Sequence, residues 1–253
     1  MNVIGLQTLI YREVGRFMRV ATQTLLSPWV TALLYILIFG SVIGAHIEAV
    51  NGVRYIDFVL PGILMLNIIG SAFSHTSFSL YFQRFAKHIE ELLTAPFSYL
   101  EMVIGFLVGG VARGVVVGLG VYIMAIFFGS AGVAHIGLFF FYAISVAIIF
   151  SLLGLLVALW SDNFEQLSIL NTFIITPLTF LGGVFNSITM LPERVQWLVR
   201  LNPFFYFVDG LRYAMIGVRE ANTVVGVLVI VGLTIFFGGL VWYLFKKGWR
   251  IRS

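Results

Sequence analysis

Long stretches without a charged side chain dominate the sequence. Four of them, at 20–47, 58–83, 166–192 and 221–245, reach or exceed the roughly 20 apolar residues that a helix needs to cross a bilayer. A fifth stretch, 114–161, is too long for one helix. Charged residues make up only 10% of the chain, far below the roughly 25% of a soluble domain, so the sequence predicts a membrane protein.

The fifth stretch contains a turn-like segment, Gly129-Ser-Ala-Gly132 followed by His135, which divides it into two helices. The sequence therefore predicts an all-α polytopic membrane protein, a single domain over 1–253, with six transmembrane helices. Their predicted ranges are 26–46, 57–80, 100–128, 134–160, 166–185 and 222–245. An even number of spans places both termini on the same side of the membrane.

The distribution of basic residues indicates which side that is. Most of them flank the termini or the segment after the second span: Arg12, Arg16, Arg19, Arg84, Lys87, Lys246, Lys247, Arg250 and Arg252. Fewer fall in the opposite loops: Arg54, Arg194, Arg200, Arg212 and Arg219. Because cytoplasmic loops carry an excess of lysine and arginine, both termini are predicted to be cytoplasmic.

Two segments outside the spans have patterns of their own. Residues 2–21 place apolar side chains on one helical face and arginines opposite, which is typical of a helix lying in the membrane interface. The apolar face is predicted to comprise Ile10, Val14, Phe17, Met18 and Ala21. Residues 186–220 are too polar and interrupted to span, and Pro192 and Pro203 each suit the first turn of a short helix. We expect external or partly re-entrant helices there.

The third such segment, FQRFAKHIEELLTAP at 82–96, is predicted to form an amphipathic cytoplasmic helix between the second and third spans. Its apolar residues recur at helical spacing, and Pro96 ends it because proline disfavours helical geometry in the preceding residue. Its length of about 14 residues, or roughly 20 Å, is too short to cross a bilayer. Two interpretations stay open: a helix that merely rests on lipid headgroups, or one that a partner pushes.

Taken in order, these features resemble one family, the membrane subunits of ABC exporters of the type-2 class. The resemblance covers essentially the whole chain and is carried by IEELLTAP at 89–96, PLTFLGGVF at 177–185, the Leu-Pro pair at 191–192 and LNPFFYFVDGLRY at 201–213. It is closest to the short six-span permeases of drug, polysaccharide or lipid-linked glycan export. It implies a prokaryotic inner-membrane exporter, with this chain as a homodimer, or paired with a close relative, bound to two ATPase subunits.

In that family the segment matching 82–96 is the coupling helix, which docks on the ATPase. The resemblance therefore implies that the coupling residues are Arg84, Lys87, His88, Glu90 and Glu91. A P-loop needs a lysine after a glycine, and none of Lys87, Lys246 and Lys247 follows one. We therefore expect no catalytic residue, cofactor or metal in this chain, and we expect ATP and magnesium on the partner subunit. The other expected partner is membrane lipid, and no nucleic acid is expected to bind.

Polar side chains form stripes on the second and fifth predicted spans. Such stripes either line a passage or hydrogen-bond between and within helices. The resemblance implies that the first and fifth spans line the dimer interface and the substrate route. The candidates for the translocation path are Asn67, Ser71, Ser168, Thr172, Phe173, Thr176, Thr179 and Phe180, and Pro177 is expected to kink the fifth span.

Three further features bear on the interior and the outer end. Gly110, Gly114 and Gly118 form a ladder that favours close helix packing. Arg113 lies deep in the third span and needs a partner or water. The candidate partners are an acid near a helix end (Asp57, Asp162 or Glu165) or the backbone carbonyl of a broken helix, and Arg113 is interpreted as a structural anchor, with a substrate site as the alternative. The candidates for an external gate are Asn202, Pro203, Tyr206, Asp209 and Arg212, with Asp209 and Arg212 paired three residues apart.

Other functions remain as alternatives. An ion-coupled carrier generally places carboxylates within its spans, whereas all eleven acidic residues here are predicted to lie in loops or at helix ends. An intramembrane enzyme is disfavoured because there is no cysteine and neither HExxH nor GxSxG occurs. A non-transporting assembly component with the same fold stays open. The cargo is expected to be hydrophobic or amphipathic: a drug, a lipid or a lipid-linked glycan.

Overall fold

The computed structural model describes residues 2–47, 49–128 and 132–251. Within these ranges the chain is helical apart from loops and one isolated bridge between Val50 and Val53. Six helical stretches are long and apolar enough to cross a membrane: Thr22–Gly40, Tyr55–Phe85, Tyr99–Phe127, Ile136–Trp160, Phe164–Leu181 and Thr223–Lys247. The prediction of an all-α chain with six spans is confirmed. The turn at Gly129, Ser130 and Ala131 and the basic residue Arg252 lie outside the described residues.

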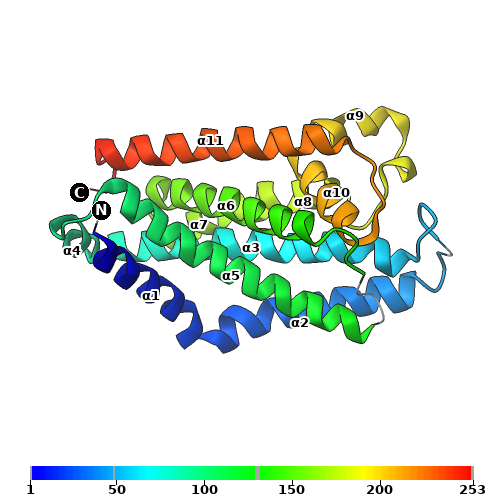
Figure 1. Ribbon diagram of the computed structural model, residues 1–253, viewed down its shortest axis with the longest axis horizontal. Helices are drawn as coiled ribbons and strands as arrows, with labels where there is room; N and C mark the ends of the chain where they lie inside the picture. Colours follow the sequence, from blue (N-terminus) through cyan, green and yellow to red (C-terminus); the bar gives the residue numbers. More distant parts are fainter. Residues whose placement is uncertain (1, 48, 129–131, 252–253) are drawn as a thin grey trace.

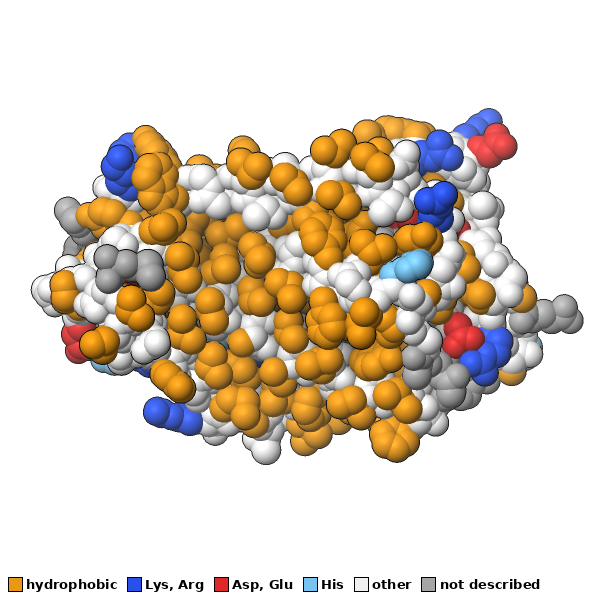
Figure 2. Space-filling model, viewed as in Figure 1, with side chains coloured by type: hydrophobic (Ala, Val, Ile, Leu, Met, Phe, Trp, Pro, Cys, Tyr) orange, Lys and Arg blue, Asp and Glu red, His pale blue; other side chains and the backbone are white. Residues whose placement is uncertain are grey.

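A long central helix organises the bundle. Helix α3 (Tyr55–Phe85) packs against α5 (Tyr99–Phe127) and α6 (Ile136–Trp160), and α11 (Thr223–Lys247) lies outside α6 (Figure 1). In its most apolar window α3 is 78% buried within the chain, whereas the first, fifth and sixth spans are each 17% buried. These three outer spans leave apolar surface uncovered, and Figure 2 shows apolar side chains across the middle of one face with charged side chains gathered toward its two ends.

Glycines allow the inner helices to approach closely. A side-chain carbon added at Gly110 would lie 2.6 Å from Thr76 Cγ2, and one at Gly118 would lie 2.8 Å from Ile68 Cγ1, both on α3. The glycine ladder predicted on the third span therefore faces the central helix. Gly154 of α6 meets α3 in the same way, with the Phe73 carbonyl oxygen 2.6 Å from the added carbon. Backbone contact of this kind is how helices associate where no hydrophobic drive exists.

The first and fifth spans are not regular α-helices. The first comprises η1 (Thr22–Leu26), α2 (Ser27–Tyr35) and η2 (Ile36–Ile43), and the fifth comprises α7 (Phe164–Leu170), η3 (Asn171–Ile175) and α8 (Thr176–Leu181); η1, η2 and η3 are π-helical. Pro28 and Pro177 each stand in the first turn of the α-helix that follows a wide turn. Proline has no N–H for the carbonyl four residues earlier and its ring crowds that carbonyl, so the helix widens before it. The kink expected at Pro177 takes this form.

The remaining helices lie at the two ends of the bundle (Figure 1). The two termini, the start of α1 (Val3–Arg19) and α4 (Ile89–Thr94) share one end, and α9 (Glu193–Leu201) and α10 (Pro203–Ile216), with the 3-10 turn η4 (Ile188–Met190), form the other. The predicted helix over 82–96 is wrong in extent, because α3 continues through Phe85 and α4 has only six residues. Lys87 interrupts the two with a left-handed φ of 59°.

Candidate functional site

Helix α4 exposes its acids and buries its apolar side. Glu90 and Glu91 are exposed, whereas Ile89 and Leu92 are 3% and 5% exposed and join the main core. The segment after α4 is fixed by a capping box in which Ser98 Oγ accepts from Glu101 N at 3.3 Å and Ser98 N donates to Glu101 Oε2 at 2.7 Å. The α4 acids thus stand on a short element that is held to the bundle along its apolar side.

The predicted coupling residues divide into two groups. Lys87, His88, Glu90 and Glu91 are exposed, and Lys87 and Glu90 border a 430 Å³ hollow. Arg84 is different, because its Nη1 donates to the carbonyl oxygens of Ala158 at 2.5 Å and Leu159 at 3.3 Å, at the carboxyl end of α6. A cation there satisfies terminal carbonyls and offsets the helix dipole. Arg84 therefore ties α3 to α6 through Nη1, and it also borders the 430 Å³ hollow.

Helix α1 packs on the bundle along one side, which shares Phe17 with the apolar face predicted to lie in the membrane interface. The buried residues are Leu9, Glu13 and Phe17, and Met18 is 52% exposed. Glycines of α5 make room for this face, since a side-chain carbon at Gly109 would lie 2.7 Å from Glu13 Cβ. The expectation that all acidic residues lie in loops or at helix ends is corrected at Glu13, and also at Asp209, which is buried in the middle of α10.

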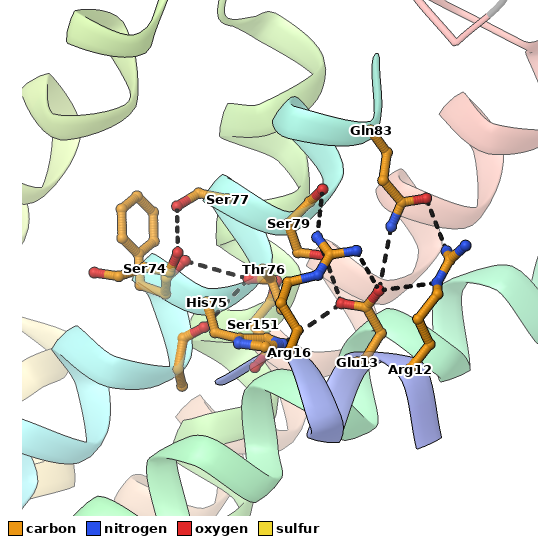
Figure 3. Close-up of polar contacts among 12 residues, drawn as sticks. Arg12, Glu13, Arg16, Ser74, His75, Thr76, Ser77, Ser79, Gln83 and Ser151 are labelled. Atoms are coloured by element: carbon orange, nitrogen blue, oxygen red, sulfur yellow. Dashed lines mark hydrogen bonds and ion pairs between the residues drawn. The ribbon is translucent and has the colours of Figure 1, made fainter. Parts of the chain in front are cut away.

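Glu13 is the centre of a polar cluster between α1 and α3 (Figure 3). Its carboxylate accepts a short hydrogen bond from Ser79 Oγ and another from Gln83 Nε2 at 3.2 Å, and Arg16 Nη2 lies 3.2 Å away. Burial would raise the pKa of Glu13, but the contact with His75, the charge of Arg16 and the hydrogen bond from Ser79 outweigh it and hold the pKa below its ordinary value. The carboxylate is therefore ionised at neutral pH.

Sequence analysis missed Glu13, although a signal was present. It stands four residues after Leu9 and four before Phe17, so the three residues share one helical face. As a charged residue, Glu13 was assigned to the polar face of the helix. Its spacing from Leu9 and Phe17, however, places it on the face that packs against the bundle. Ser79 and Gln83, the α3 residues that compensate it, are also buried.

The candidates for the translocation path do not form one cluster. Those on the fifth span that are exposed in the single chain are Ser168, Thr172, Phe173 and Phe180, while Thr176 is half-buried. Thr179 is buried and donates to the Ile175 carbonyl oxygen at 2.6 Å. On α3, Asn67 donates to the Ile63 carbonyl oxygen at 2.8 Å, and Ser71 is buried. Instead, Ser168 shares a 320 Å³ hollow with Ser74 and Ser77 of α3.

At the opposite end, the proposed local pair of Asp209 and Arg212 is absent from the described ion pairs. Asp209 accepts from the backbone N–H groups of Glu220 at 2.7 Å and Ala221 at 3.0 Å. Arg212 is fully buried, donates to the carbonyl oxygens of Phe58 at 3.1 Å and Gly183, and lies over the Phe58 ring at 3.8 Å. The two residues therefore hold different loops, and the acid nearest Arg212 is Glu220 at 3.8 Å.

The other gate candidates shape the start of α10. Asn202 Oδ1 accepts from Phe204 N at 3.1 Å and its Nδ2 donates to the Leu178 carbonyl oxygen at 2.6 Å, which joins α10 to α8. Pro203 occupies the first turn of α10, where no N–H is needed. Tyr206 donates its hydroxyl to the Arg200 carbonyl oxygen at 2.9 Å. This end is held by side-chain to backbone bonds.

Arg113 of α5 takes a backbone carbonyl. Its Nη2 lies 3.4 Å from the Thr24 carbonyl oxygen, in the π-helical turn before Pro28. Of the predicted acids, Asp57 lies 2.8 Å from Arg54 and Asp162 lies 3.0 Å from Arg250. Pro28 follows Thr24 by four residues and has no N–H to donate to its carbonyl oxygen, so this oxygen is available to Arg113.

Comparison with known proteins assigns the family. Residues 5–216 match the model of the ABC-2 type transporter membrane family. The chain belongs to that family. The inner membrane transport permease YadH of Escherichia coli K12 is 37% identical over 250 residues, which cover 99% of this chain and 98% of YadH. Nodulation protein J of Rhizobium meliloti is 25% identical, covering 79% of this chain and 76% of its own length.

This ABC-2 permease is a multi-pass protein of the inner membrane. It is a transport subunit without an ATPase domain, which agrees with the lack of a glycine-lysine pair for a P-loop. Membership implies a partner ATPase subunit.

Proposed function

We propose that this permease forms the translocation path of an ATP-driven exporter as a dimer, bound to two ATPase subunits that carry ATP and magnesium. The observation that carries the proposal is the combination in α4 of exposed Glu90 and Glu91 with buried Ile89 and Leu92. An exposed acidic face on an otherwise anchored short helix suits recognition by a basic groove on a partner. Lys87 and His88 would border the same contact.

The attachment of α4 suits the transmission of force. Arg84 bonds the end of α3 to the end of α6 just before α4, and the capping box fixes the start of α5 just after it. Asn2 N also donates to Glu101 Oε1 at 2.6 Å, which ties the start of α1 to the same point. A displacement of α4 would therefore move the ends of α1, α3, α5 and α6 together.

The dimer and the path are assigned to the outer spans. The first and fifth spans leave apolar side chains such as Leu34, Ile38 and Phe173 exposed, with Phe173 at 73%. A second permease copy would cover part of these faces, and their π-helical turns, Ser168 and Thr172 would face the path. We assign as cargo an amphipathic molecule such as a drug, a lipid or a lipid-linked glycan, because the exposed faces combine aromatic rings with hydroxyls.

Charge reversal on α4 tests the coupling. The double variant Glu90→Lys/Glu91→Lys is expected to lose co-purification with the ATPase while its membrane yield and monodispersity stay unchanged, because both side chains are exposed. The matched control is Glu193→Lys, an exposed acid at the other end of the bundle. Unchanged ATPase recovery with the double variant would remove α4 as the docking element.

Glu13 bears on the ion-coupled alternative, since it is a buried carboxylate. Arg16 and Arg12 lie 3.2 Å and 3.8 Å from it, and its lowered pKa keeps it ionised, so it is poorly suited to take up and release a proton near neutral pH. Transport by the permease alone in proteoliposomes under an ion gradient would revive the carrier function. A coupled exporter is expected to show no such uptake without its ATPase.

A further inference from the structure

A 320 Å³ cavity lies where α1, η1, α3 and α5 meet. Its wall carries the guanidinium groups of Arg16 and Arg113, the imidazole of His75, the hydroxyl of Ser74 and the rings of Phe17 and Phe78. Figure 3 shows Arg16, Ser74 and His75 close together at the junction of α1 and α3. None of the residues that line this cavity is acidic.

The positive charge of the cavity is only partly compensated. Arg16 has Glu13 at 3.2 Å, whereas Arg113 has one described hydrogen bond, to the Thr24 carbonyl oxygen at 3.4 Å. Arg113 Nε is buried and has no hydrogen-bond partner among the described residues, whereas the almost fully buried His75 faces the Glu13 carboxylate, with Nε2 3.6 Å from Oε2. Ionised side chains at membrane depth normally have a counter-charge or water. The charge balance at Arg113 therefore favours an anion.

The position of the cavity indicates what kind of anion could reach it. It lies at the junction between α1, which ends at Arg19, and the first span, which begins at Thr22. Arg113 stands in the middle of α5 (Tyr99–Phe127), roughly 21 Å along the helix from its start, so the recess extends inward from the end of the bundle that holds the termini (Figure 1). Ser74 and Phe78 also line the neighbouring 320 Å³ hollow, which continues the surface with Ser77, Ser168 and Asn171. A basic recess thus adjoins a surface of hydroxyl, amide and aromatic groups.

We infer that this cavity binds the phosphate group of an anionic amphiphile, with Arg113 as its principal ligand and Arg16 and His75 beside it. The planar guanidinium offers paired N–H donors that match phosphate oxygens. The apolar chain would lie outward along Phe78, which is 48% exposed, and polar groups attached to the phosphate would reach Ser77 and Asn171. The amphiphile is either a bilayer phospholipid or the cargo, and the second source rests on the proposed function.

Binding of a defined probe tests the site. The purified permease in a neutral maltoside detergent is titrated with dodecyl phosphate, and the bound probe is counted by native mass spectrometry. Arg113→Gln is expected to weaken binding at least tenfold, which corresponds to about 1.4 kcal/mol. The control is Arg19→Gln, an exposed arginine one turn beyond Arg16, which should bind as the parent does. Equal binding by Arg113→Gln, or equal loss in both variants, would overturn the inference.

Arg113→Lys covers the case in which the glutamine variant does not fold. It keeps the charge and loses the planar fork, so its affinity for dodecyl phosphate is expected to fall while the effect of ionic strength remains. Unchanged affinity would rule out the guanidinium as the ligand. Inorganic phosphate is titrated in parallel. If it displaces dodecyl phosphate at equal concentration, the alkyl chain of the probe contributes nothing to binding, and the assignment of an amphiphile is overturned.

Two arms separate the sources. Native mass spectra of the permease–ATPase complex in phosphatidylglycerol nanodiscs are compared before and after ATP turnover. If phosphatidylglycerol is retained at this site, the amphiphile is a structural lipid. If a phosphate amphiphile that co-purified from the source membrane is released on turnover, the amphiphile is cargo. Either result upholds the site. ATPase recovery with Arg113→Gln is measured on the same preparations, so loss of the phosphate site is distinguished from failure of the α4 coupling.

Discussion

Glu13 and Arg212 are charged side chains with no exposed surface, and each is compensated in a different way. The negative charge of Glu13 is compensated by two arginines and by two hydrogen-bond donors from α3. Arg212 is compensated mainly by the backbone, since it donates to the carbonyl oxygens of Phe58 and Gly183 and lies over an aromatic ring, with the Glu220 carboxylate 3.8 Å away. A buried charge left without such partners is costly, so both residues are expected to be sensitive to conservative replacement.

The Glu13→Gln variant tests whether the compensated charge of Glu13 stabilises the fold. It leaves Arg16 without its counter-charge and is expected to destabilise the permease by about 1.5–3 kcal/mol, the usual contribution of a hydrogen bond to a charged group. The measurement is the midpoint of thermal unfolding in detergent, and Glu193→Gln, an exposed acid, is the control. A midpoint equal to that of the parent would mean that the cluster does not stabilise α1 on the bundle.

The pH dependence of the same cluster follows from the lowered pKa of Glu13. A carboxylate whose pKa is depressed in the folded state contributes stability that is complete above its ordinary pKa of 4.5. That contribution is lost as the pH falls through the lowered value. Between pH 6 and pH 8 the difference in unfolding midpoint between the parent and Glu13→Gln is therefore expected to stay constant, and a difference that vanished within this range would contradict an ionised Glu13.

At the scale of elements, helix existence was predictable and helix packing was not. The uncharged runs fixed the six spans to within a few residues, because a bilayer demands length and apolarity that composition reveals directly. The single helix over 82–96 was wrong because pattern alone does not show that Lys87 takes a left-handed backbone. The burial of Glu13 on α1 was not predicted, because its partner residues on α3, Ser79 and Gln83, are far from it in sequence.

The glycine contacts between inner helices allow a test at this scale. Gly154→Ala would place its added carbon 2.6 Å from the Phe73 carbonyl oxygen, a backbone atom that cannot move away. Overpacking of this kind is expected to cost about 1–3 kcal/mol. Gly232→Ala on α11 is the control, because no atom lies within 4 Å of its added carbon and alanine favours the helix. Equal thermal midpoints for the two variants would contradict the close contact of α6 with α3.

For the whole molecule, the arrangement of the ends was predictable from the count of spans and the placement of basic residues. Both termini lie at the end that holds α4 (Figure 1). The candidate site was predictable only in part. The acids of α4 were predicted from the sequence. The junction of α1 with α3 and α5 was not, because it depends on contacts between residues separated by about 60 to 100 positions, such as Ser79 with Glu13 and Asn2 with Glu101. No local period reports such contacts.

Topology can be tested cleanly because the chain contains no cysteine. Single cysteines at His88 and Arg194, both exposed, are introduced into the permease expressed without its ATPase. A membrane-impermeant maleimide is expected to label His88→Cys only in inside-out vesicles and Arg194→Cys only in spheroplasts. The reverse pattern would place α4 outside the cell and would exclude its contact with an ATPase.

The wide turns of the two proline-bearing spans determine which way the side chains beyond them face. A π-helical turn forms its hydrogen bonds between residues i and i+5, so it holds one more residue than its α-helical neighbours. Relative to an unbroken α-helix, one surplus residue offsets the side chains beyond it by about 100° around the helix axis. Because Pro28 and Pro177 fix the wide turns that precede them, the parts of each span before and after its proline present different faces to their surroundings.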